Sequence, residues 1–488
     1  MLNRLEQREV ARRARRLDPG RAALRPRPDL PPGTDLLPQI RHIVVLMMEN
    51  HSYDNYLGCL GMVSNRGDGF TRGPDGLPTA SDPRRGGGEV RAYHLPSTQQ
   101  VPHVPTQTWH ASHEQYDHGR CDGFVRSVQD TVPGAPAVDD SIPMGYWTER
   151  DLPFYYGLAR TFPLADRWFC SCLGPTFPNR RFLISGTAHG LIDDLPFGMV
   201  GYPSGGTVFD LLTRHGISWR DYYHGSRAGI VLKRALGGWS LTALRRLMSL
   251  GRWFPPLVRA VEGDLQFTAD LYPLGLARCL LHLASTRRFF ADADNGTLPG
   301  FCIVDPDFRR YSEENPQDIR RGEGFAAEVI TRVMRGKGWP YTLLIWLYDE
   351  HGGYFDHVQP PAAAAPDNIP GRSLLAMPGW VRACLKPFFG RYIAEVANID
   401  AGPQNYGTYG FRVPAVIVSP YAKPGYLTSV PLDHTSVLKL VGQKWNLPPL
   451  TDRDAAATAP LDALDLAGEP AFLTPPDLPA PALTWGTW

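Results

Sequence analysis

The sequence lacks an excess of charge of one sign. It has 50 Lys and Arg residues against 49 Asp and Glu residues in 488 positions, a formal net charge of +1. A chain without a basic or acidic field has no general attraction for nucleic acid or other polyions. We therefore expect no nucleic-acid partner, and we expect specificity to come from a local site.

Long apolar runs and a regular cysteine framework are also missing. The N-terminal segment is basic and has no apolar stretch as long as a secretory signal needs, and no later segment has about 20 uninterrupted apolar residues, as a transmembrane helix requires. The 7 cysteines are odd in number and scattered, which favours reduced thiols over disulfides. These absences predict a cytoplasmic chain.

Three regions differ in composition. Residues 1–38 are basic and then proline-rich, a composition that predicts a mobile arm. Residues 39–456 form the predicted main domain. Residues 457–488 are rich in Pro and Ala, which predicts a tail extended over the surface. Within the main domain, residues 225–298 predict a helical insertion or cap, because basic and apolar residues alternate over 241–290. Such helices suit a bilayer interface and peripheral membrane contact, or they are packed helices that cover a site.

Apolar segments of strand length alternate with helical segments along the main domain. The nearly all-apolar run at 341–348 is typical of a strand buried on both faces. Further strands are predicted at HIVVLMM before Glu49 and at 217–223, 301–304 and 413–419, and helices at 151–159, 207–215 and 322–334. This alternation predicts an α/β fold with a mostly parallel central sheet and helices on both faces.

Acidic and amide residues follow two of the predicted buried strands. Glu49 and Asn50 come after HIVVLMM, and Asp349 and Glu350 come after TLLIWLY. Ligands bind outside the carboxyl ends of strands in open α/β sheets, and like carboxylates held close together need a cation between them. Each carboxylate alone also fits a helix cap or a salt bridge. Together they predict one divalent metal ion, with Ca²⁺, Mg²⁺, Mn²⁺ and Zn²⁺ all left open.

A second pattern surrounds Thr176. Gly-Pro before it indicates a turn, and Pro178 suits the first turn of a helix, so Thr176 is predicted at a helix N-terminus, where an anion such as phosphate binds. A hydroxyl beside a divalent metal loses its proton more readily and becomes a nucleophile. Arg180 would add a charge-assisted hydrogen bond to a phosphate oxygen. The alternative is that Thr176 only caps a helix.

These motifs, in this order, resemble the bacterial and plant phosphoesterases that include non-specific phospholipases C and a group of acid phosphatases, within the alkaline-phosphatase-like superfamily. The resemblance covers roughly residues 40–456. The matching segments are Glu49-Asn-His-Ser-Tyr-Asp54, Asp166-Arg-Trp-Phe-Cys-Ser-Cys-Leu-Gly-Pro-Thr-Phe-Pro-Asn-Arg180, Tyr348-Asp-Glu-His-Gly-Gly-Tyr-Phe-Asp-His-Val358, Tyr409-Gly-Phe-Arg-Val-Pro414 and Asp433-His-Thr-Ser436.

The resemblance implies an alkaline-phosphatase-like α/β sandwich with a helical or loop cap, and a phosphorylated enzyme intermediate on Thr176. It also implies one main metal site, formed by Glu49, Asn50, Asp349, Glu350 and the Thr176 oxygen.

The histidines that the family usually has near the site are only partly present in this sequence. By the resemblance, His434 and His357 would lie near the site as proton donors or orienting groups, although lone histidines are more often structural. Two histidines usual in the family appear replaced, by Gln107 and by Asn315, which keep hydrogen bonding but remove acid–base capacity near neutral pH. His110 and His113, on the segment after Gln107, are candidates to take over one role.

Two functions follow. The first is a metal-dependent phosphoesterase, phospholipase C-like or acid-phosphatase-like, that acts on a phosphorylated small molecule or a phospholipid. The second, motivated by the two replaced histidines, is a family member repurposed as a transferase or as a binding protein for a phosphorylated or sulfated ligand. The oligomeric state is left open.

Overall fold

The computed structural model describes residues 19–102, 105–129, 139–194, 202–203, 205–224, 279–371 and 405–486. Its centre is an 8-stranded sheet with the strand order β12-β6-β11-β10-β1-β9-β7-β8. In chain order these strands are β1 His42–Met48, β6 Leu164–Ala165, β7 Trp219–Tyr223, β8 Leu283–Ser285, β9 Phe301–Val304, β10 Thr342–Tyr348, β11 Ala415–Val418 and β12 Leu427–Thr428.

The two longest strands lie side by side in the middle of the sheet. β1 pairs in parallel with β10, with Met48 opposite Tyr348, and in parallel with β9, with Leu46 opposite Val304. Every residue of β10 is buried, as expected for a strand with helices on both faces. Only β11 runs antiparallel to its neighbours. The predicted mostly parallel sheet is confirmed, and the carboxyl ends of β1, β9 and β10 meet at one edge.

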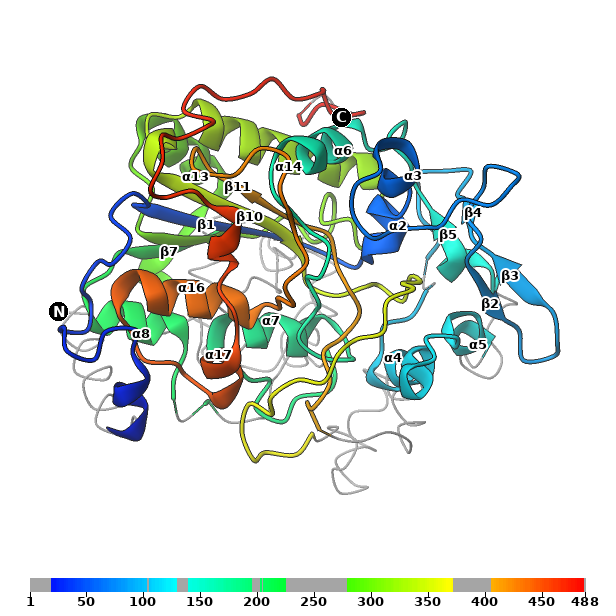
Figure 1. The fold of residues 1–488 in the computed structure, drawn as a ribbon, viewed down its shortest axis with the longest axis horizontal. Helices are drawn as coiled ribbons and strands as arrows, with labels where there is room; N and C mark the ends of the chain where they lie inside the picture. Colours follow the sequence, from blue (N-terminus) through cyan, green and yellow to red (C-terminus); the bar gives the residue numbers. More distant parts are fainter. Residues whose placement is uncertain are drawn as a thin grey trace, which may run out of the picture.

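Helices cover both faces of the sheet (Figure 1). One layer contains α6, α13 and α14, and the other contains α7, α8, α16 and α17. Their bounds are α6 Pro153–Thr161, α7 Thr176–Ser185, α8 Val208–Arg214, α13 Thr286–Asn295, α14 Ile319–Arg335, α16 Thr435–Trp445 and α17 Asp452–Ala456. The helices predicted at 151–159, 207–215 and 322–334 are α6, α8 and α14, and the α/β sandwich is confirmed.

Smaller elements border one end of the sheet, on the right of Figure 1. They comprise α2 Tyr53–Leu57, α3 Leu60–Ser64, α4 Trp109–Tyr116 and α5 Phe124–Gln129, the antiparallel pair β2 Ser81–Pro83 and β3 Glu89–Arg91, and the parallel pair β4 Tyr93–His94 and β5 Gly145–Tyr146.

The described part of the N-terminal arm is bound to the domain. It starts with a short 3-10 helix at Pro19–Leu24. Farther along, the Gly33 amide donates to the Trp445 carbonyl at 2.8 Å and the Leu36 amide to the Lys444 carbonyl at 2.7 Å. From residue 19 onward the arm is therefore held on the end of α16, which differs from the predicted mobile arm.

The C-terminal tail crosses the layer of α13 and α14 in an extended course (Figure 1). The Ala482 amide donates to Glu323 at 2.8 Å. The ring centroids of Trp485 and Phe290 are 5.1 Å apart, and those of Phe472 and Phe162 are 4.7 Å apart. The tail thus wraps the surface and is held by specific contacts.

Most of the predicted cap, residues 225–278, lies outside the described residues. The part of 241–290 that is described has a 3-10 turn at Leu280–His282, strand β8 and the first turns of α13. The prediction of helix is therefore wrong at β8, because parallel pairing with β7 satisfies the backbone of this segment instead. Across the described ranges, no helix combines the length and the apolar character needed to cross a bilayer.

Candidate active site at the carboxyl edge of the sheet

The turns that follow β1 and β10 interlock. Asn50 has a φ of 69°, and its amide donates to Asp349 Oδ1 at 3.1 Å. The Asp349 amide donates to the Met48 carbonyl at 3.2 Å. Gly352 has a φ of 67°, and a Cβ atom there would collide with the Asn50 carbonyl, so glycine is required for this approach. The structure therefore brings the two predicted ligand pairs together.

Two buried carboxylates at this edge each have one oxygen without a hydrogen-bond partner among the described residues. These oxygens are Glu49 Oε2 and Glu350 Oε1. Burial raises the pKa of both groups well above the usual range, with the charge of Asp349 adding to the effect. Unpaired buried carboxylate oxygens are costly unless a cation or donor meets them. The donor set, hard oxygens with spare lone pairs, fits a divalent metal ion.

Asp349 is the best-connected member of the cluster. Its Oδ1 accepts from the amides of Asn50 and Glu350, at 3.1 and 2.8 Å, and its Oδ2 accepts from Arg180 Nε at 2.9 Å. Each carboxylate oxygen can accept more than one bond, so Asp349 keeps the capacity to bind a cation while its side chain is fixed in place.

Thr176 is the first residue of α7, as predicted. Its Oγ1 is 3.4 Å from Asn50 Oδ1, which joins the helix terminus to the turn that follows β1. The next amide, of Phe177, donates to Asp194 Oδ1 at 2.7 Å, and burial raises the pKa of Asp194 to about 8. A carboxyl group therefore already uses one donor of the helix N-terminus, so a phosphate there would meet Asp194 as a neighbour.

Arg180 lies beneath the site and binds the ends of the central strands. It is fully buried, and besides its bond to Asp349 its Nη1 is 3.3 Å from Asp305 Oδ1, at the end of β9. It also donates to the Met48 carbonyl at 3.3 Å, and its guanidinium lies 4.8 Å from the Phe308 ring centre. The guanidinium thus neutralises two buried carboxylates; its contact with phosphate stays a prediction.

His434 touches the site through the backbone of Asp349. Its Nε2 lies 2.6 Å from the Asp349 carbonyl, and its Nδ1 lies 3.4 Å from Trp168 Nε1. Because a carbonyl only accepts and an indole N–H only donates, this geometry defines a neutral ring protonated at Nε2. Burial also lowers the pKa of His434. The ring therefore positions Asp349 and has both nitrogens engaged.

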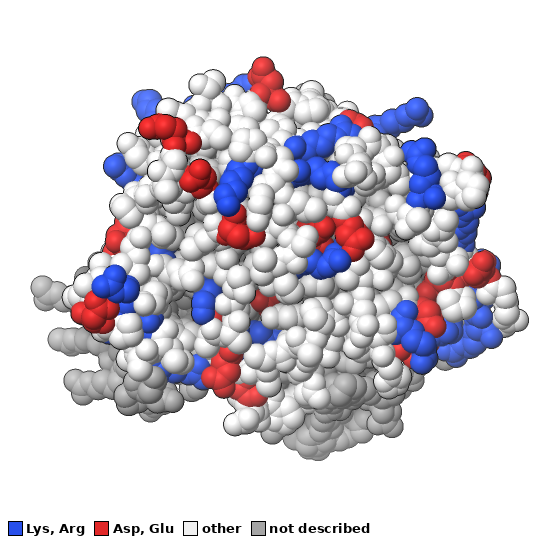
Figure 2. Space-filling view, in the orientation of Figure 1, with Lys and Arg blue, Asp and Glu red and all other residues white. Residues whose placement is uncertain are grey.

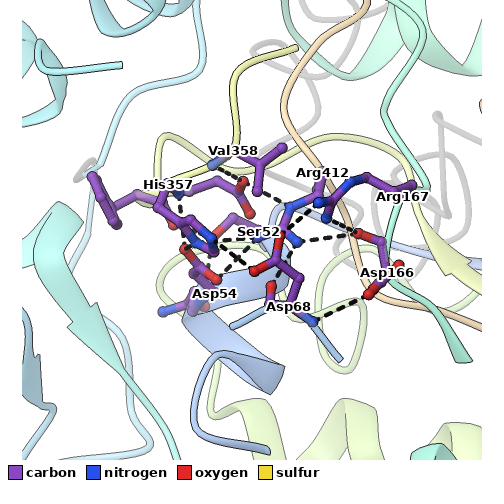
Figure 3. A network of polar contacts seen from close by, with 11 residues as sticks. Ser52, Asp54, Asp68, Asp166, Arg167, His357, Val358 and Arg412 are labelled. Carbon is purple, nitrogen blue, oxygen red and sulfur yellow. Dashed lines mark hydrogen bonds and ion pairs between the residues drawn. The ribbon is translucent and has the colours of Figure 1, made fainter. Parts of the chain in front are cut away.

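His357 belongs to a neighbouring network around Arg412 (Figure 3). Its Nδ1 lies 2.6 Å from Asp54 Oδ2 and its Nε2 3.3 Å from Asp68 Oδ1. The buried Arg412 donates to Asp54 at 3.1 Å and to Asp356 at 2.9 Å. Ligand atoms of Asp54, Asp356 and His357 all lie within 4.8 Å of one another, so these three residues could hold a metal ion.

The chain supplies its own cations to this second cluster. Burial alone would lower the pKa of His357, but the charge and hydrogen bond of Asp54 outweigh it and raise that pKa to about 9. Asp356 Oδ2 has no hydrogen-bond partner among the described residues, yet Arg412 and protonated His357 together balance the two buried aspartates. Fewer positively charged side chains balance the carboxylates around Glu49 and Glu350, so that cluster is the stronger candidate for a metal site.

His113 lies on α4, the helix that packs against the segment before Thr176. Its Nδ1 is 2.7 Å from the Trp109 carbonyl, and burial lowers its pKa to about 4. Trp109 packs so closely on Gly174 that a Cβ atom there would meet its ring. His113 is therefore neutral and lies on the helix that packs against the segment before Thr176, and its catalytic role stays a prediction.

The two replaced histidine positions lie in loops of this region. The Gln107 carbonyl accepts from Ser112 Oγ at 3.2 Å, and Asn315 Nδ2 donates to the Val101 carbonyl at 3.0 Å. The neighbour of Gln107, Thr106, approaches the ligand turn so closely that a Cβ atom at Gly353 would meet its backbone. The segment of Gln107 thus borders the turn that follows Asp349 and Glu350.

Several acidic residues of the cluster were not recognised from the sequence. Asp305 follows β9, so the rule that pointed to Glu49 and Asp349 also points to it. Glu314 and Asp194 lie in loops without a strand signal; the charge of Glu314 raises the pKa of Glu49, and burial raises the pKa of Glu314 itself to about 7.

A mostly parallel α/β sandwich with a helix-borne hydroxyl and a cluster of carboxylate and amide oxygens at its carboxyl edge is the arrangement expected of a phosphoesterase-type α/β protein. The chain belongs to the Phosphoesterase family, whose model matches residues 40–448. This membership confirms the family resemblance of the sequence and supports phosphoester hydrolysis at the level of the family.

The chain is similar to three curated phospholipases C. It is 29% identical to Phospholipase C B of Mycobacterium tuberculosis, over 84% of this chain and 74% of that protein. It is 26% identical to Non-specific phospholipase C1 of Arabidopsis thaliana, over 92% and 75%. It is 29% identical to Non-hemolytic phospholipase C of Pseudomonas aeruginosa, over 84% of this chain but 54% of that protein. Among solved structures, Ps i-CgsB in complex with k-i-k-neocarrahexaose is similar with a TM-score of 0.30 and 13% identity, over 60% of this chain and 66% of that chain.

Proposed function

We propose that the chain is a phosphoric ester hydrolase in which Thr176 is the nucleophile and Glu49, Asn50, Asp349 and Glu350, with the Thr176 oxygen, hold one divalent metal ion. The observation that carries the proposal is the pair of partnerless, buried carboxylate oxygens on Glu49 and Glu350, in a site that Asn50 joins to the Thr176 hydroxyl. When bound, the metal would neutralise the carboxylates and lower the pKa of the hydroxyl.

The chain's own groups would carry the rest of the reaction. Thr176 Oγ1 forms the bond to phosphorus, the bond from phosphorus to the leaving oxygen breaks, and water then releases the phosphoryl group from Thr176. The Thr176 hydroxyl donates to Asn50 Oδ1 at 3.4 Å, and this amide oxygen orients the hydroxyl but takes no proton, so the proton passes to a neighbouring carboxylate or to water. Asp349 is fixed by Arg180 and His434, which pre-organises the site.

The substrate class follows from the relatives. Their names are those of phospholipases C, so a phosphodiester of a phospholipid is the first expectation for this chain, with a phosphomonoester second. The alternative of a transferase or binding protein is not favoured by the family match. A cytoplasmic location stays a proposal; the cysteines of the described part of the chain are free thiols.

A substrate panel tests the proposal. The chelator-treated full chain, with Ca²⁺, Mg²⁺, Mn²⁺ or Zn²⁺ added singly, is assayed on p-nitrophenyl phosphate, bis-p-nitrophenyl phosphate, p-nitrophenyl phosphorylcholine and phosphatidylcholine vesicles. We expect metal-dependent release, strongest from diesters. Thr176→Ala should lower the rate at least about a thousandfold, while Thr176→Ser keeps a measurable rate. Full activity in Thr176→Ala would remove Thr176 from its proposed role.

A further inference from the structure

A buried carboxylate next to the site collects three tyrosine hydroxyls. Glu313 is fully buried. Its Oε2 accepts from Tyr56 at 2.8 Å and from Tyr348, and its Oε1 accepts from Tyr155 at 2.6 Å. Three hydrogen bonds to one buried carboxyl group fix its side chain in place in a medium of low dielectric constant. Neither the proposed reaction nor the sequence motifs use Glu313.

The contacts of Glu313 reach both turns that carry the proposed metal ligands. Tyr348 is the last residue of β10 and directly precedes Asp349. The carbonyl of Glu313 lies 3.1 Å from Nε2 of His51, the residue directly after Asn50. One acidic residue is therefore bonded, through one neighbour each, to the ligand turn of β1 and to the ligand turn of β10.

The surroundings hold these links in one geometry. The His51 ring is stacked between Tyr56, at 4.2 Å between ring centroids, and Tyr354, at 5.1 Å. Glu313 itself has a φ of 78°, which a residue with a side chain rarely adopts. A Cβ atom at Gly322 of α14 would collide with the Glu313 side chain. A strained backbone that persists under such packing is a common feature of functional sites.

We propose that Glu313 is a positioning residue that sets the spacing between the β1 and β10 ligand turns and thereby the affinity for the metal; this rests on the proposed function. Tyr155 provides the matched comparison. It donates to the same carboxylate and is equally buried, but it belongs to α6, which carries no proposed ligand. Removing the Tyr348 hydroxyl frees a ligand turn, whereas removing the Tyr155 hydroxyl does not.

The test is direct metal binding to the chelator-treated full chain. Titration calorimetry with Ca²⁺, Mg²⁺, Mn²⁺ and Zn²⁺, each added singly, is performed on the unmodified chain, Tyr348→Phe, Tyr155→Phe and Glu313→Gln. Thermal unfolding of the metal-free forms is recorded beside it. Partners that orient metal ligands typically contribute about 10- to 100-fold in affinity. We expect the dissociation constant to rise at least about tenfold in Tyr348→Phe and Glu313→Gln and less than about threefold in Tyr155→Phe, with similar thermal destabilisation of the two tyrosine variants.

Equal losses of affinity in Tyr348→Phe and Tyr155→Phe would overturn the inference, because Glu313 would then act only through overall stability. If Glu313→Gln does not fold, the two tyrosine variants decide the question alone. If the variants show the expected order of metal affinities but the unmodified chain hydrolyses no substrate, the proposed reaction is overturned and the positioning role is supported. An unmodified chain that binds none of the four ions would overturn the proposed metal site and the inference together.

Discussion

Replacing His357 by glutamine should flatten the dependence of stability on pH between neutral and alkaline conditions. In the folded chain, Nδ1 of His357 lies 2.6 Å from Asp54 Oδ2, and the other nitrogen faces Asp68 at 3.3 Å. Partial burial and the charge of Arg412 lower the pKa of His357, but the charges of Asp54 and Asp356 outweigh them and raise it to about 9. The His357 ring therefore binds its proton more tightly in the folded state than in the unfolded state.

The size of the effect follows from the displacement of the pKa. A rise from an ordinary value of 6.5 to about 9 is equivalent to about 3 kcal/mol of unfolding free energy. Since 32% of the side chain is exposed, solvent screening reduces this to about 1–2 kcal/mol. Because the folded-state pKa is raised, this stability is fully present below pH 6.5 and is lost as pH rises through about 9.

Denaturant unfolding at about pH 6, 7.5 and 9.5 measures the effect. The unmodified chain should lose stability across this interval, and His357→Gln should be less stable at pH 6 and lose less on the way to pH 9.5. His94→Gln is the control, because His94 forms a 2.8 Å pair with Asp151 but 46% of its side chain is exposed, so little change is expected. Identical pH profiles of His357→Gln and the unmodified chain would refute the reasoning.

Three further changes address the core of the site and the tail. Arg180→Met leaves two buried aspartates without their cation and should cost about 3–5 kcal/mol in chemical denaturation; a loss below about 1 kcal/mol would show that the pairing is unimportant. His434→Gln should lower kcat/KM about 10- to 100-fold without removing a limb of the pH–rate profile, whereas a lost limb would identify a general acid. Trp485→Ala should destabilise the chain by about 1–2 kcal/mol by loss of aromatic packing and leave Mn²⁺ affinity unchanged; weaker Mn²⁺ binding would link the tail to the site.

Much of the fold could be predicted from the sequence because its signals are local. Apolar runs of strand length predicted β1, β9, β10 and β11, and the turn residues before Thr176 predicted the start of α7. The polar residue pairs that follow β1 and β10 were expected to meet, because the carboxyl ends of parallel strands lie at one edge of the sheet. Asn50 and Asp349 are indeed in contact. Each of these conclusions depends on a few neighbouring residues and on the geometry of a parallel sheet.

The partners of individual side chains were decided by the tertiary structure. Arg180 meets Asp349 from 169 residues away, and the carbonyl that engages His434 lies 85 residues away; no pattern in the sequence encodes either contact. The Tyr155 hydroxyl reaches Glu313 only because packing of α6 against the sheet places it there. Hydrophobic periodicity and turn chemistry act over a few residues and set the elements and their motifs, whereas charge pairing and ring orientation depend on which elements packing brings together.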